Sequence, residues 1–199
     1  KHLTTAEGGA VLTNNKSYAD KISLLRSHGV KRPKKKLDKI GLWYQEMIDL
    51  GYNYRLSDVQ AALGVSQINR LEKFLKKRKF IANFYDKIFS NDKKFKVPKV
   101  RKNFSHSYHL YPLLVDFKKV GLSRKEIFKQ FLKHNIKLQV HYIPVNIQPY
   151  YKKKFGYIKK DFINSNKFYK KEISLPIYYD LKNYELIYIR RVCKKIFKI

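Results

Sequence analysis

The feature that most constrains the fold is a long helical pattern in the middle of the chain. From Ser57 to about Phe89, apolar residues recur at three- and four-residue intervals, the spacing that gives a helix one apolar face. Ser57 and Gln60 make a capping-box pair at its start. The pattern predicts one helix of about 32 residues, about 48 Å long, which is enough to connect two domains.

The segment before this helix contains shorter signals. Residues 8–15 pair two glycines with an apolar run and two asparagines, which predicts a short buried strand ending in a turn. A helix should follow, with Gly29 as its stop and with Ala19, Ile22 and Leu25 on one face. Residues 31–50, which begin with a run of lysines, are expected to form a solvated loop.

Strand and helix patterns alternate after a polar connector at residues 91–103. We expect strands at 108–117 and 138–141, and helices that begin at the Ser123–Glu126 capping pair, at Phe162 and at Asn183. The final helix should turn six apolar side chains inward: Leu186, Ile187, Ile189, Val192, Ile196 and Phe197. The sequence therefore predicts a first domain at 1–90, which includes the long helix, and a small α+β domain at 91–199.

The net charge of +30 invites a nucleic-acid function. However, only 9 of the 45 basic residues are arginine, the residue that suits bidentate recognition of phosphates and bases. The lysines are also spread along the chain and accompany abundant Asn, Ile, Tyr and Phe, a mix that indicates compositional bias. A basic module that binds nucleic acid or another polyanion remains the alternative, and it predicts strongly salt-dependent binding.

Cysteine and histidine spacing gives little support to disulfide or metal chemistry. The lone Cys193 cannot form an internal disulfide, which indicates a reducing, cytoplasmic setting. His106 and His109 precede a predicted strand, where residues three apart point to opposite faces, so we expect no metal site there. No apolar run is long enough to span a bilayer. The chain opens with neither an initiator methionine nor the apolar region of a signal peptide, so we expect it to be incomplete.

Three segments carry side chains suited to chemistry. The first runs from Lys1 to the Glu7-Gly8-Gly9 turn, where paired glycines let the backbone pack closely around a group bound to an amine. In the second, Asn53 and Arg55 precede a helix N-terminus, a place that favours anions. In the third, His141 and Tyr142 leave a strand into a proline-restricted loop. Taken singly, each segment could equally be structural: a common turn, an ordinary capped helix and packed aromatic residues.

In this order, the segments resemble the DegT-type sugar aminotransferases, which are pyridoxal 5'-phosphate (PLP) enzymes. The resemblance rests on Lys-x-x-Thr-Thr-x-Glu-Gly-Gly at 1–9, Arg-Ser-His-Gly at 26–29, and Gly-Tyr-Asn-Tyr-Arg-Leu-Ser-Asp-x-Gln-Ala-Ala-Leu-Gly at 51–64. It continues in His-Leu-Tyr at 109–111, His-Tyr-x-Pro at 141–144 and Ser-Leu-Pro at 174–176. The residues at 140–151 and the Thr-Thr-Ala-Glu-Gly-Gly stretch favour the branch of 4-aminotransferases of pseudaminic acid synthesis.

The resemblance implies a fold and a set of roles. The fold would be the α/β, aspartate-aminotransferase-like architecture of fold-type I PLP-dependent transferases, represented by its C-terminal part: a remnant of the large domain and a small α+β domain. Lys1 would hold PLP and shuttle protons, and Asn53 would reach the PLP phosphate of the partner subunit in a homodimer. Arg55 would lie near the nucleotide phosphates, and His141 and Tyr142 would border the sugar pocket. The implied reaction transfers an amino group, usually from glutamate, to a UDP-linked 4-keto-6-deoxy sugar for a surface glycan.

The family pattern also includes a long stretch before the lysine, with the acidic partner of the pyridine nitrogen, the ring-stacking aromatic residue and most phosphate donors. None of these residues is in this sequence. Without the acidic partner the cofactor is a poorer electron sink. We therefore expect the 199-residue chain by itself to bind PLP weakly or not at all and to be inactive in transamination. A related enzyme that uses a dTDP or GDP sugar is a second possibility.

Overall fold

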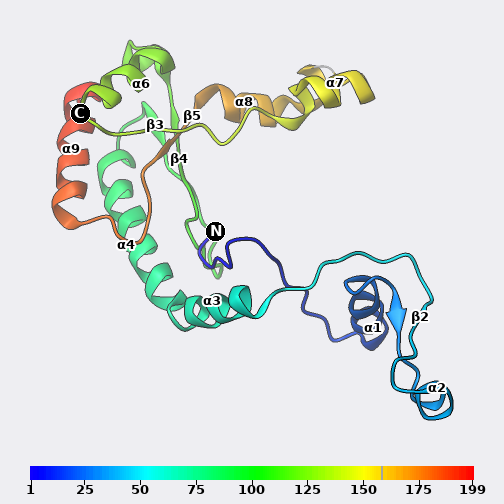
Figure 1. The fold of residues 1–199 in the computed structure, drawn as a ribbon. Coiled ribbons are helices and arrows are strands. Elements are labelled where there is room, and N and C mark those ends of the chain that lie inside the picture. The colour runs from blue at the N-terminus through cyan, green and yellow to red at the C-terminus, as the bar shows by residue number, and fades with distance from the viewer. Residues whose placement is uncertain (158) are drawn as a thin grey trace. The chain divides into compact units, whose positions relative to one another are not determined.

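The computed structural model describes residues 1–157 and 159–199. It contains two compact units, which are described separately below. The first unit consists of Lys1 and Leu3–Arg70, and the second consists of His2 and Leu71–Ile199. Figure 1 follows the elements of each unit along the chain. The predicted domain boundary at residue 90 stays a prediction, and the boundary between these compact units lies at Arg70 and Leu71.

The first unit combines short helices with a two-stranded antiparallel ribbon. Its elements are α1 (Lys16–Leu25), β1 (Val30–Lys31), α2 (Lys34–Ile40), β2 (Glu46–Met47) and α3 (Asp58–Asn69). The predicted loop at 31–50 is therefore wrong, because it contains α2 and pairs β1 with β2. Helix α1 agrees with the prediction, and the Asn15 side chain caps it by accepting from the Tyr18 N–H at 3.3 Å.

The predicted buried strand at 8–15 is also wrong. Within the described residues this segment pairs with no strand, and Val11 and Leu12 are 66% and 95% exposed. A strand is stable only when a neighbouring strand takes up its backbone hydrogen bonds and its apolar face is covered. Neither condition is met for this segment within the first unit.

The long helix predicted from Ser57 to Phe89 is two helices. Helix α3 ends at Asn69 and α4 (Leu71–Phe89) begins two residues later. Arg70 between them has φ −103° and ψ −4°, and its N–H bonds to the carbonyl of Gln67, three residues back. The Ser57–Gln60 capping box is confirmed. Apolar spacing continues through Arg70, which is why periodicity alone did not reveal the break.

The second unit is built around a three-stranded antiparallel sheet in the order β3-β4-β5. Its strands are β3 (Phe95–Lys96), β4 (Tyr111–Val115) and β5 (Glu172–Leu175), and its helices besides α4 are α5 (Phe117–Val120), α6 (Arg124–Lys133), α7 (Pro149–Phe155), α8 (Ile163–Lys171) and α9 (Asn183–Phe197), with short 3-10 turns at Val145–Ile147 and Lys159–Phe162. Figure 1 shows α4, α6 and α9 beside the sheet.

The core of this unit lies between the sheet and these helices. Alternate residues of β4, namely Tyr111, Leu113 and Val115, are fully buried, as expected for a strand with one face on the core. A cluster of four phenylalanines joins the sheet to the helices, with ring centroids 5.0 to 6.0 Å apart: Phe89 and Phe95, Phe131 and Phe197. Such aromatic pairs add to the stabilisation from burial itself.

Most of the predicted elements in this unit are present. The Ser123–Glu126 capping box and the final helix from Asn183 are confirmed. One predicted core residue of that helix is wrong, since Ile187 is 50% exposed. The predicted strand at 138–141 is reduced to one bridge between Gln139 and Ser174. Strand β5 lay outside the predicted elements because it has only four residues and directly follows helix α8, and the burial of Glu172 and Ser174 is not evident from their polar side chains.

The packing of α9 in this core can be tested through the reactivity of Cys193, the only cysteine of the sequence. Cys193 on α9 has no exposed surface, and burial raises the pKa of its thiol well above the ordinary value. We expect a thiol reagent to modify the folded chain at least about a hundredfold more slowly than the urea-unfolded chain, because reaction requires opening of the core. The time course of release of a coloured thiolate measures both rates. Equal rates in the two states would mean that α9 does not pack as described.

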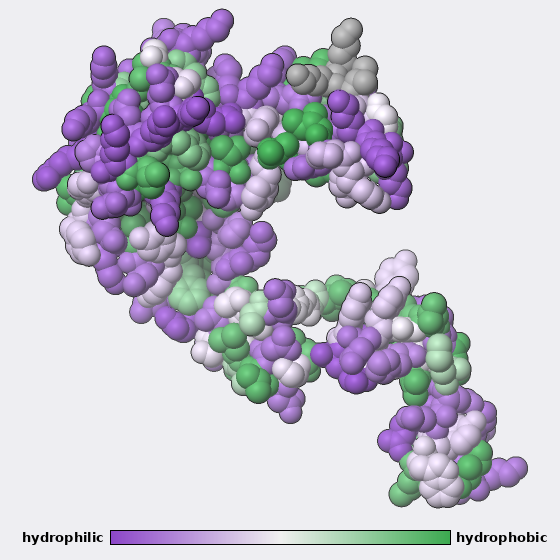
Figure 2. All heavy atoms as spheres, turned by 45° about the horizontal axis from the view of Figure 1, so that its top comes forward, coloured by the Kyte–Doolittle hydropathy of each residue, from purple (hydrophilic) through white to green (hydrophobic). Residues whose placement is uncertain are grey.

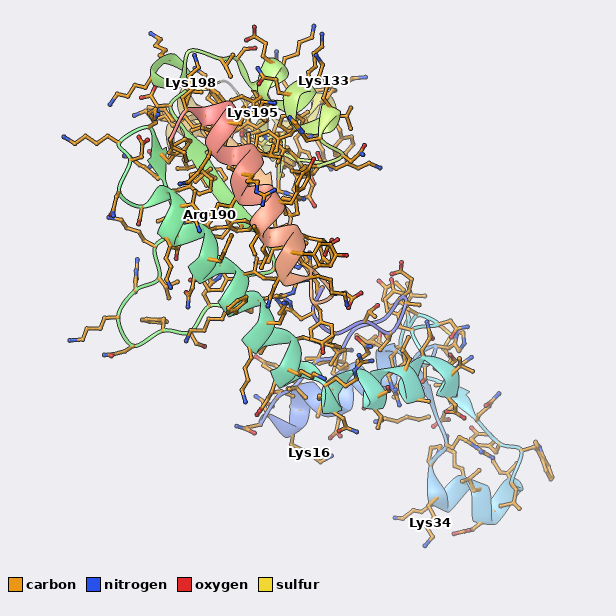
Figure 3. The ribbon with its side chains drawn as sticks, turned by 90° about the vertical axis from the view of Figure 1, so that its left-hand side faces the viewer. Lys16, Lys34, Lys133, Arg190, Lys195 and Lys198 are labelled. Atoms are coloured by element: carbon orange, nitrogen blue, oxygen red, sulfur yellow. The ribbon has the colours of Figure 1, made fainter. Side chains whose placement is uncertain are left out.

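The face drawn in Figure 2 is largely hydrophilic, with separate hydrophobic areas. In Figure 3 the labelled basic side chains come from different elements: Lys16 and Lys34 from α1 and α2, Lys133 from α6, and Arg190, Lys195 and Lys198 from α9 and its end. Positive charge is therefore distributed over both units. Among the described residues, no helix combines the length and the apolar character needed to cross a membrane.

Candidate functional site

An open hollow of about 1030 Å³ in the first unit brings together two of the three sequence segments that carry chemistry, along with residues of α1. It is lined by the Glu7-Gly8-Gly9 turn and residues 10–13, by Ala19, Ile22, Ser23 and Arg26, and by Asn53, Tyr54, Arg55, Leu56 and Gln60. Two guanidinium groups, of Arg26 and Arg55, and two carboxamides, of Asn53 and Gln60, thus line the same space. This donor set suits an anion such as a phosphate.

Backbone pairing brings the second segment against the end of α1. Tyr52 N donates to the Leu25 carbonyl at 2.6 Å and Tyr54 N donates to the Arg26 carbonyl at 2.9 Å. Ser27 and Asn53 form an isolated antiparallel bridge. Arg26 therefore lies next to Asn53 on a paired backbone. No role was predicted for Arg26 from the sequence, although its place in the Arg-Ser-His-Gly stretch was the available signal.

Two glycines make this close pairing possible. Gly29 has φ +68°, and a Cβ atom there would lie 1.8 Å from the Asp49 carbonyl oxygen. A Cβ atom on Gly51 would lie 2.1 Å from the Gly29 nitrogen. Both distances are far below any real contact, so a side chain at either position would push the two segments apart. These glycines fix the approach of Asn53 to Arg26.

A side chain of helix α3 holds the Glu-Gly-Gly turn in its place at the hollow. The Gln60 side chain donates from Nε2 to the Glu7 carbonyl at 3.0 Å, while its Oε1 accepts from the Ser57 N–H at 3.2 Å. One side chain thus completes the capping box and holds the turn. The N-terminal end of α3 lies at the hollow, where the helix dipole favours a negative ligand.

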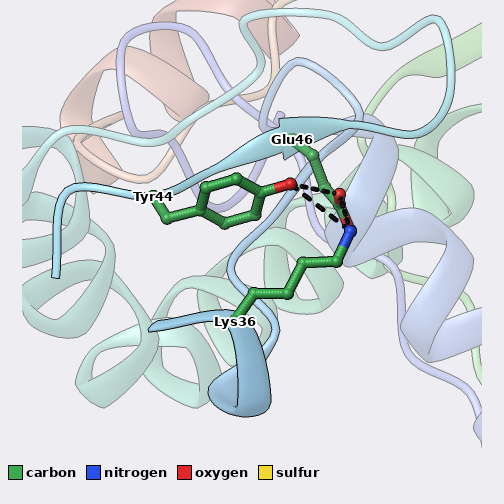
Figure 4. Close-up of polar contacts among 3 residues, drawn as sticks. All are labelled: Lys36, Tyr44 and Glu46. Atoms are coloured by element: carbon green, nitrogen blue, oxygen red, sulfur yellow. Dashed lines mark hydrogen bonds and ion pairs between the residues drawn. The ribbon is translucent and has the colours of Figure 1, made fainter. Parts of the chain in front are cut away.

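A polar cluster closes the ribbon that follows Gly29. Lys36 Nζ on α2 lies 2.6 Å from Glu46 Oε2, and the Tyr44 hydroxyl donates to the same oxygen at 2.8 Å, as Figure 4 shows. These hydrogen bonds lower the pKa of the Glu46 carboxyl, and the bond to Glu46 raises the pKa of Lys36. Because the cluster is solvent-exposed, it adds little stability. It connects α2 to β2 and fits no binding role.

Lys1 is an exposed residue of the first unit and is not among the residues that line the hollow. Of the predicted residues, Asn53 and Arg55 line the hollow, together with Arg26, and Lys1 does not. The roles predicted for Lys1, Asn53 and Arg55 stay predictions at this point.

The other two predicted residues, His141 and Tyr142, belong to the second unit. Their rings meet edge to face, with centroids 4.6 Å apart, and the Tyr142 side chain is 70% exposed. His141 donates its backbone N–H to Glu172 Oε2 at 3.1 Å, and its ring Nδ1 lies 2.8 Å from Ser174 Oγ. The bond to Glu172 also explains why the predicted strand at 138–141 does not continue to His141. The His141 N–H is bound by the Glu172 side chain and not by a main-chain carbonyl of β5.

A second group in this unit was not predicted from the sequence. Arg78 on α4 donates through Nη1 to the carbonyls of Tyr108, His109 and Ile177, each at 3.0 Å. The His2 ring packs edge to face on His109 with centroids 5.4 Å apart. Burial, together with the nearby charge of Arg78, lowers the pKa of His2 to about 4, so that its ring is neutral at pH 7.

Metal binding has no support in the described part of the chain, where no group of three or more His, Cys, Asp or Glu side chains could hold an ion.

The fold and these segments define a class of enzyme. Residues 1–197 match the model of the DegT/DnrJ/EryC1/StrS aminotransferase family, and the chain belongs to that family. Its members are PLP-dependent aminotransferases. The predicted fold class is confirmed by solved structures of sugar aminotransferases that match the whole chain and about half of their own length.

Among its relatives is the UDP-4-amino-4,6-dideoxy-N-acetyl-beta-L-altrosamine transaminase of Campylobacter jejuni, 43% identical over 181 residues, which are 91% of this chain and 46% of the relative. The solved structure of Helicobacter pylori PseC, an aminotransferase of pseudoaminic acid biosynthesis, matches with a TM-score of 0.87 and 33% identity. It covers 100% of this chain and 51% of that one. The sugar aminotransferase Spr1654 of Streptococcus pneumoniae, in its PMP-form, shares the fold at 24% identity and a TM-score of 0.85. The chain spans about half the length of the curated relatives it matches.

Proposed function

We propose that this chain serves in PLP-dependent transamination of a UDP-linked 4-keto-6-deoxy sugar, with glutamate as amino donor, in the synthesis of pseudaminic acid or a related surface glycan. The observation that carries the proposal is the hollow of the first unit, where Asn53, Arg55 and Arg26 face one space beside the Glu-Gly-Gly turn. The relatives named above supply the choice of sugar. A cytoplasmic homodimer is part of the proposal and rests on the family resemblance and the lone cysteine.

The residues present fit a phosphorylated cofactor and a nucleotide substrate. Lys1 would hold PLP through its amine and carry the proton between the donor carbon and the sugar C4. Asn53 would donate its carboxamide to the phosphate of the cofactor held by the partner subunit. Arg55 and Arg26 would bind the diphosphate of the nucleotide, and His141 and Tyr142 would border the sugar. When bound, PLP supplies the electron sink for transfer of the amino group.

The hollow supports this assignment through its chemistry. Its glycine-rich edge lets a ligand approach the backbone, and the start of α3 adds a positive end to the two guanidinium groups. The lining offers a phosphate-bearing ligand the guanidinium groups of Arg26 and Arg55 and the carboxamide of Asn53, and Glu7 is the one acidic residue in that lining. The experiment that tests the function is an amination assay with UDP-, dTDP- and GDP-linked 4-keto sugars, using an enzyme that joins this chain to the preceding segment found in its relatives.

Substitution of Arg55 should weaken binding of the nucleotide sugar. In that enzyme we expect Arg55→Gln to raise KM about 10- to 100-fold, because a charge-assisted hydrogen bond to phosphate contributes about 1.5–3 kcal/mol. Steady-state kinetics with the accepted sugar measure the change. Arg101→Gln, which removes another exposed guanidinium, from the second unit, is the matched control and should leave KM unchanged. Equal effects of the two variants would show that general positive charge, and no specific contact, attracts the substrate.

The alternative of a nucleic-acid-binding module would need basic side chains gathered on one surface. The five lysines and one arginine labelled in Figure 3 instead come from several elements of both units. Filter binding of DNA and RNA at two salt concentrations tests this alternative directly. Tight, strongly salt-dependent binding together with no amination of any sugar would favour the binding module over the enzyme.

A further inference from the structure

A buried polar chain behind His141 has no role in the function proposed so far. Glu172 and Ser174 lie two residues apart on β5, so their side chains point to the same face of the strand. Glu172 has no exposed surface and Ser174 is 4% exposed. The Ser174 hydroxyl donates to Glu172 Oε1 at 2.5 Å, and its oxygen lies 2.8 Å from His141 Nδ1.

The backbone brings His141 to this position. Gln139 and Ser174 exchange both main-chain hydrogen bonds, at 3.3 and 2.7 Å, so the segment that follows Gln139 runs antiparallel along β5. Two residues on, the His141 N–H reaches Glu172 Oε2 at 3.1 Å. Glu172 therefore binds the main chain of His141 with one oxygen and, through Ser174, its ring with the other.

The direction of the hydrogen bonds follows from counting protons. A serine hydroxyl has one proton, and here that proton is directed to the carboxylate. The Ser174 oxygen can then only accept from His141, so the proton of the neutral imidazole must be on Nδ1. The other ring nitrogen, Nε2, is left with a lone pair, and no hydrogen bond to it is found among the described residues.

We infer that Glu172 and Ser174 are positioning residues that hold His141 in its Nδ1–H form, so that Nε2 accepts a hydrogen bond from a sugar hydroxyl or amide N–H. This inference deepens the proposed function and rests on it for the ligand. An acceptor at this position selects ligands that present a donor, since a ligand without one would leave the lone pair unpaired. The neighbouring Tyr142 ring, at 4.6 Å, would limit the directions from which the donor can approach.

The tautomer can be measured on the 199-residue chain itself, without cofactor or activity. Long-range ¹H–¹⁵N spectra of histidine-labelled chain, recorded at about pH 8.5 where an ordinary imidazole is neutral, distinguish Nδ1–H from Nε2–H by the two nitrogen shifts. His141→Gln identifies the signal by its disappearance. We expect the Nδ1–H pattern for His141. An Nε2–H pattern in the unaltered chain would overturn the inference, whatever reaction the enzyme catalyses.

Glu172→Gln is the decisive variant because glutamine has the same shape as glutamate but carries an NH₂ donor in place of one acceptor oxygen. With the amide oxygen on the His141 N–H, the amide NH₂ donates to Ser174, whose proton must then go to His141 Nδ1. We therefore expect the His141 signal to change to the Nε2–H pattern. Glu72→Gln, on an exposed part of α4, is the matched control and should leave the pattern unchanged. A variant that retains Nδ1–H would contradict the proposed chain. Ser174→Ala is a second variant, which should abolish the preference for Nδ1–H.

A kinetic measurement separates this inference from the function on which it rests. In the enzyme that contains this chain, Ser174→Ala should raise KM for the accepted sugar nucleotide about tenfold while kcat changes less, the amount expected from loss of one oriented hydrogen bond. Ser165→Ala, an exposed serine on α8, is the control. If the tautomer changes but KM does not, His141 lies outside the sugar site and the inference about the ligand fails. If no sugar is aminated at all, the proposed function fails while the tautomer result still stands.

Discussion

Replacing Lys1 by methionine should reduce amination by at least about a thousandfold in an enzyme that contains this chain and the preceding segment of its relatives. Methionine keeps an unbranched side chain, one atom shorter, and removes the amine. The variant would lose both the covalent hold on PLP and the group that carries the proton, and a positioned acid–base group alone contributes about 10²- to 10⁴-fold. Turnover of a UDP-4-keto sugar with glutamate measures the effect.

The matched control is Lys16→Met, which removes an exposed amine from α1 in the same unit and leaves the net charge of the two variants equal. It should retain full turnover. The absorbance of bound PLP gives a second reading, because only the Lys1 variant should lose the band of the covalently held cofactor. Full amination by Lys1→Met would remove the basis for the assignment of every other residue in the site.

Truncation of Phe131 should strongly destabilise the second unit. Phe131 lies on α6 and has no exposed surface. The centroid of its ring is 5.6 Å from that of Phe197 on α9. Phe131→Ala would remove buried apolar area and leave a cavity, at a cost of about 3–5 kcal/mol. Since domains are stable by only about 5–15 kcal/mol, much of the stability would be lost. Urea unfolding followed by far-UV circular dichroism measures the change.

The neighbouring Leu132 provides the control, because it is on the same helix and 57% exposed. Leu132→Ala should change the free energy of unfolding by less than about 1 kcal/mol. The urea slopes of both variants should match that of the unaltered chain, so that the midpoints report stability alone. Similar midpoints for the two variants would mean that α6 does not pack through Phe131.

Local signals in the sequence predicted local structure well. The capping boxes at Ser57 and Ser123 depend only on side chains three residues apart, and both are present. The break at Arg70 could not be predicted in this way, because apolar spacing is the same on its two sides. Strand β5 was missed because it has only four residues and directly follows helix α8, and α2 was missed because its lysines indicate a solvated loop.

The candidate site shows the same division. The Asn53–Arg55 segment could be selected for its residue types and its place before a helix. Arg26 lies in the Arg-Ser-His-Gly stretch, but its relation to Asn53 could not be predicted, since it depends on backbone pairing between Ser27 and Asn53, 26 residues apart. The contacts of Glu172 and Ser174 with His141 could not be predicted either, because they exist only after the segment at Gln139 pairs with β5.

Arg78 has a mechanical consequence for the second unit. Its guanidinium holds carbonyls from residues 108 and 109 before β4 and from residue 177 after β5, each at 3.0 Å. Because Tyr111 of β4 lies opposite Leu175 of β5, these carbonyls are at one end of the β4–β5 pair, and any slide of α4 along its own axis must pull both strands at that end together. A lysine in its place would offer a single ammonium on a flexible stem, and the two segments would then be free to shift independently.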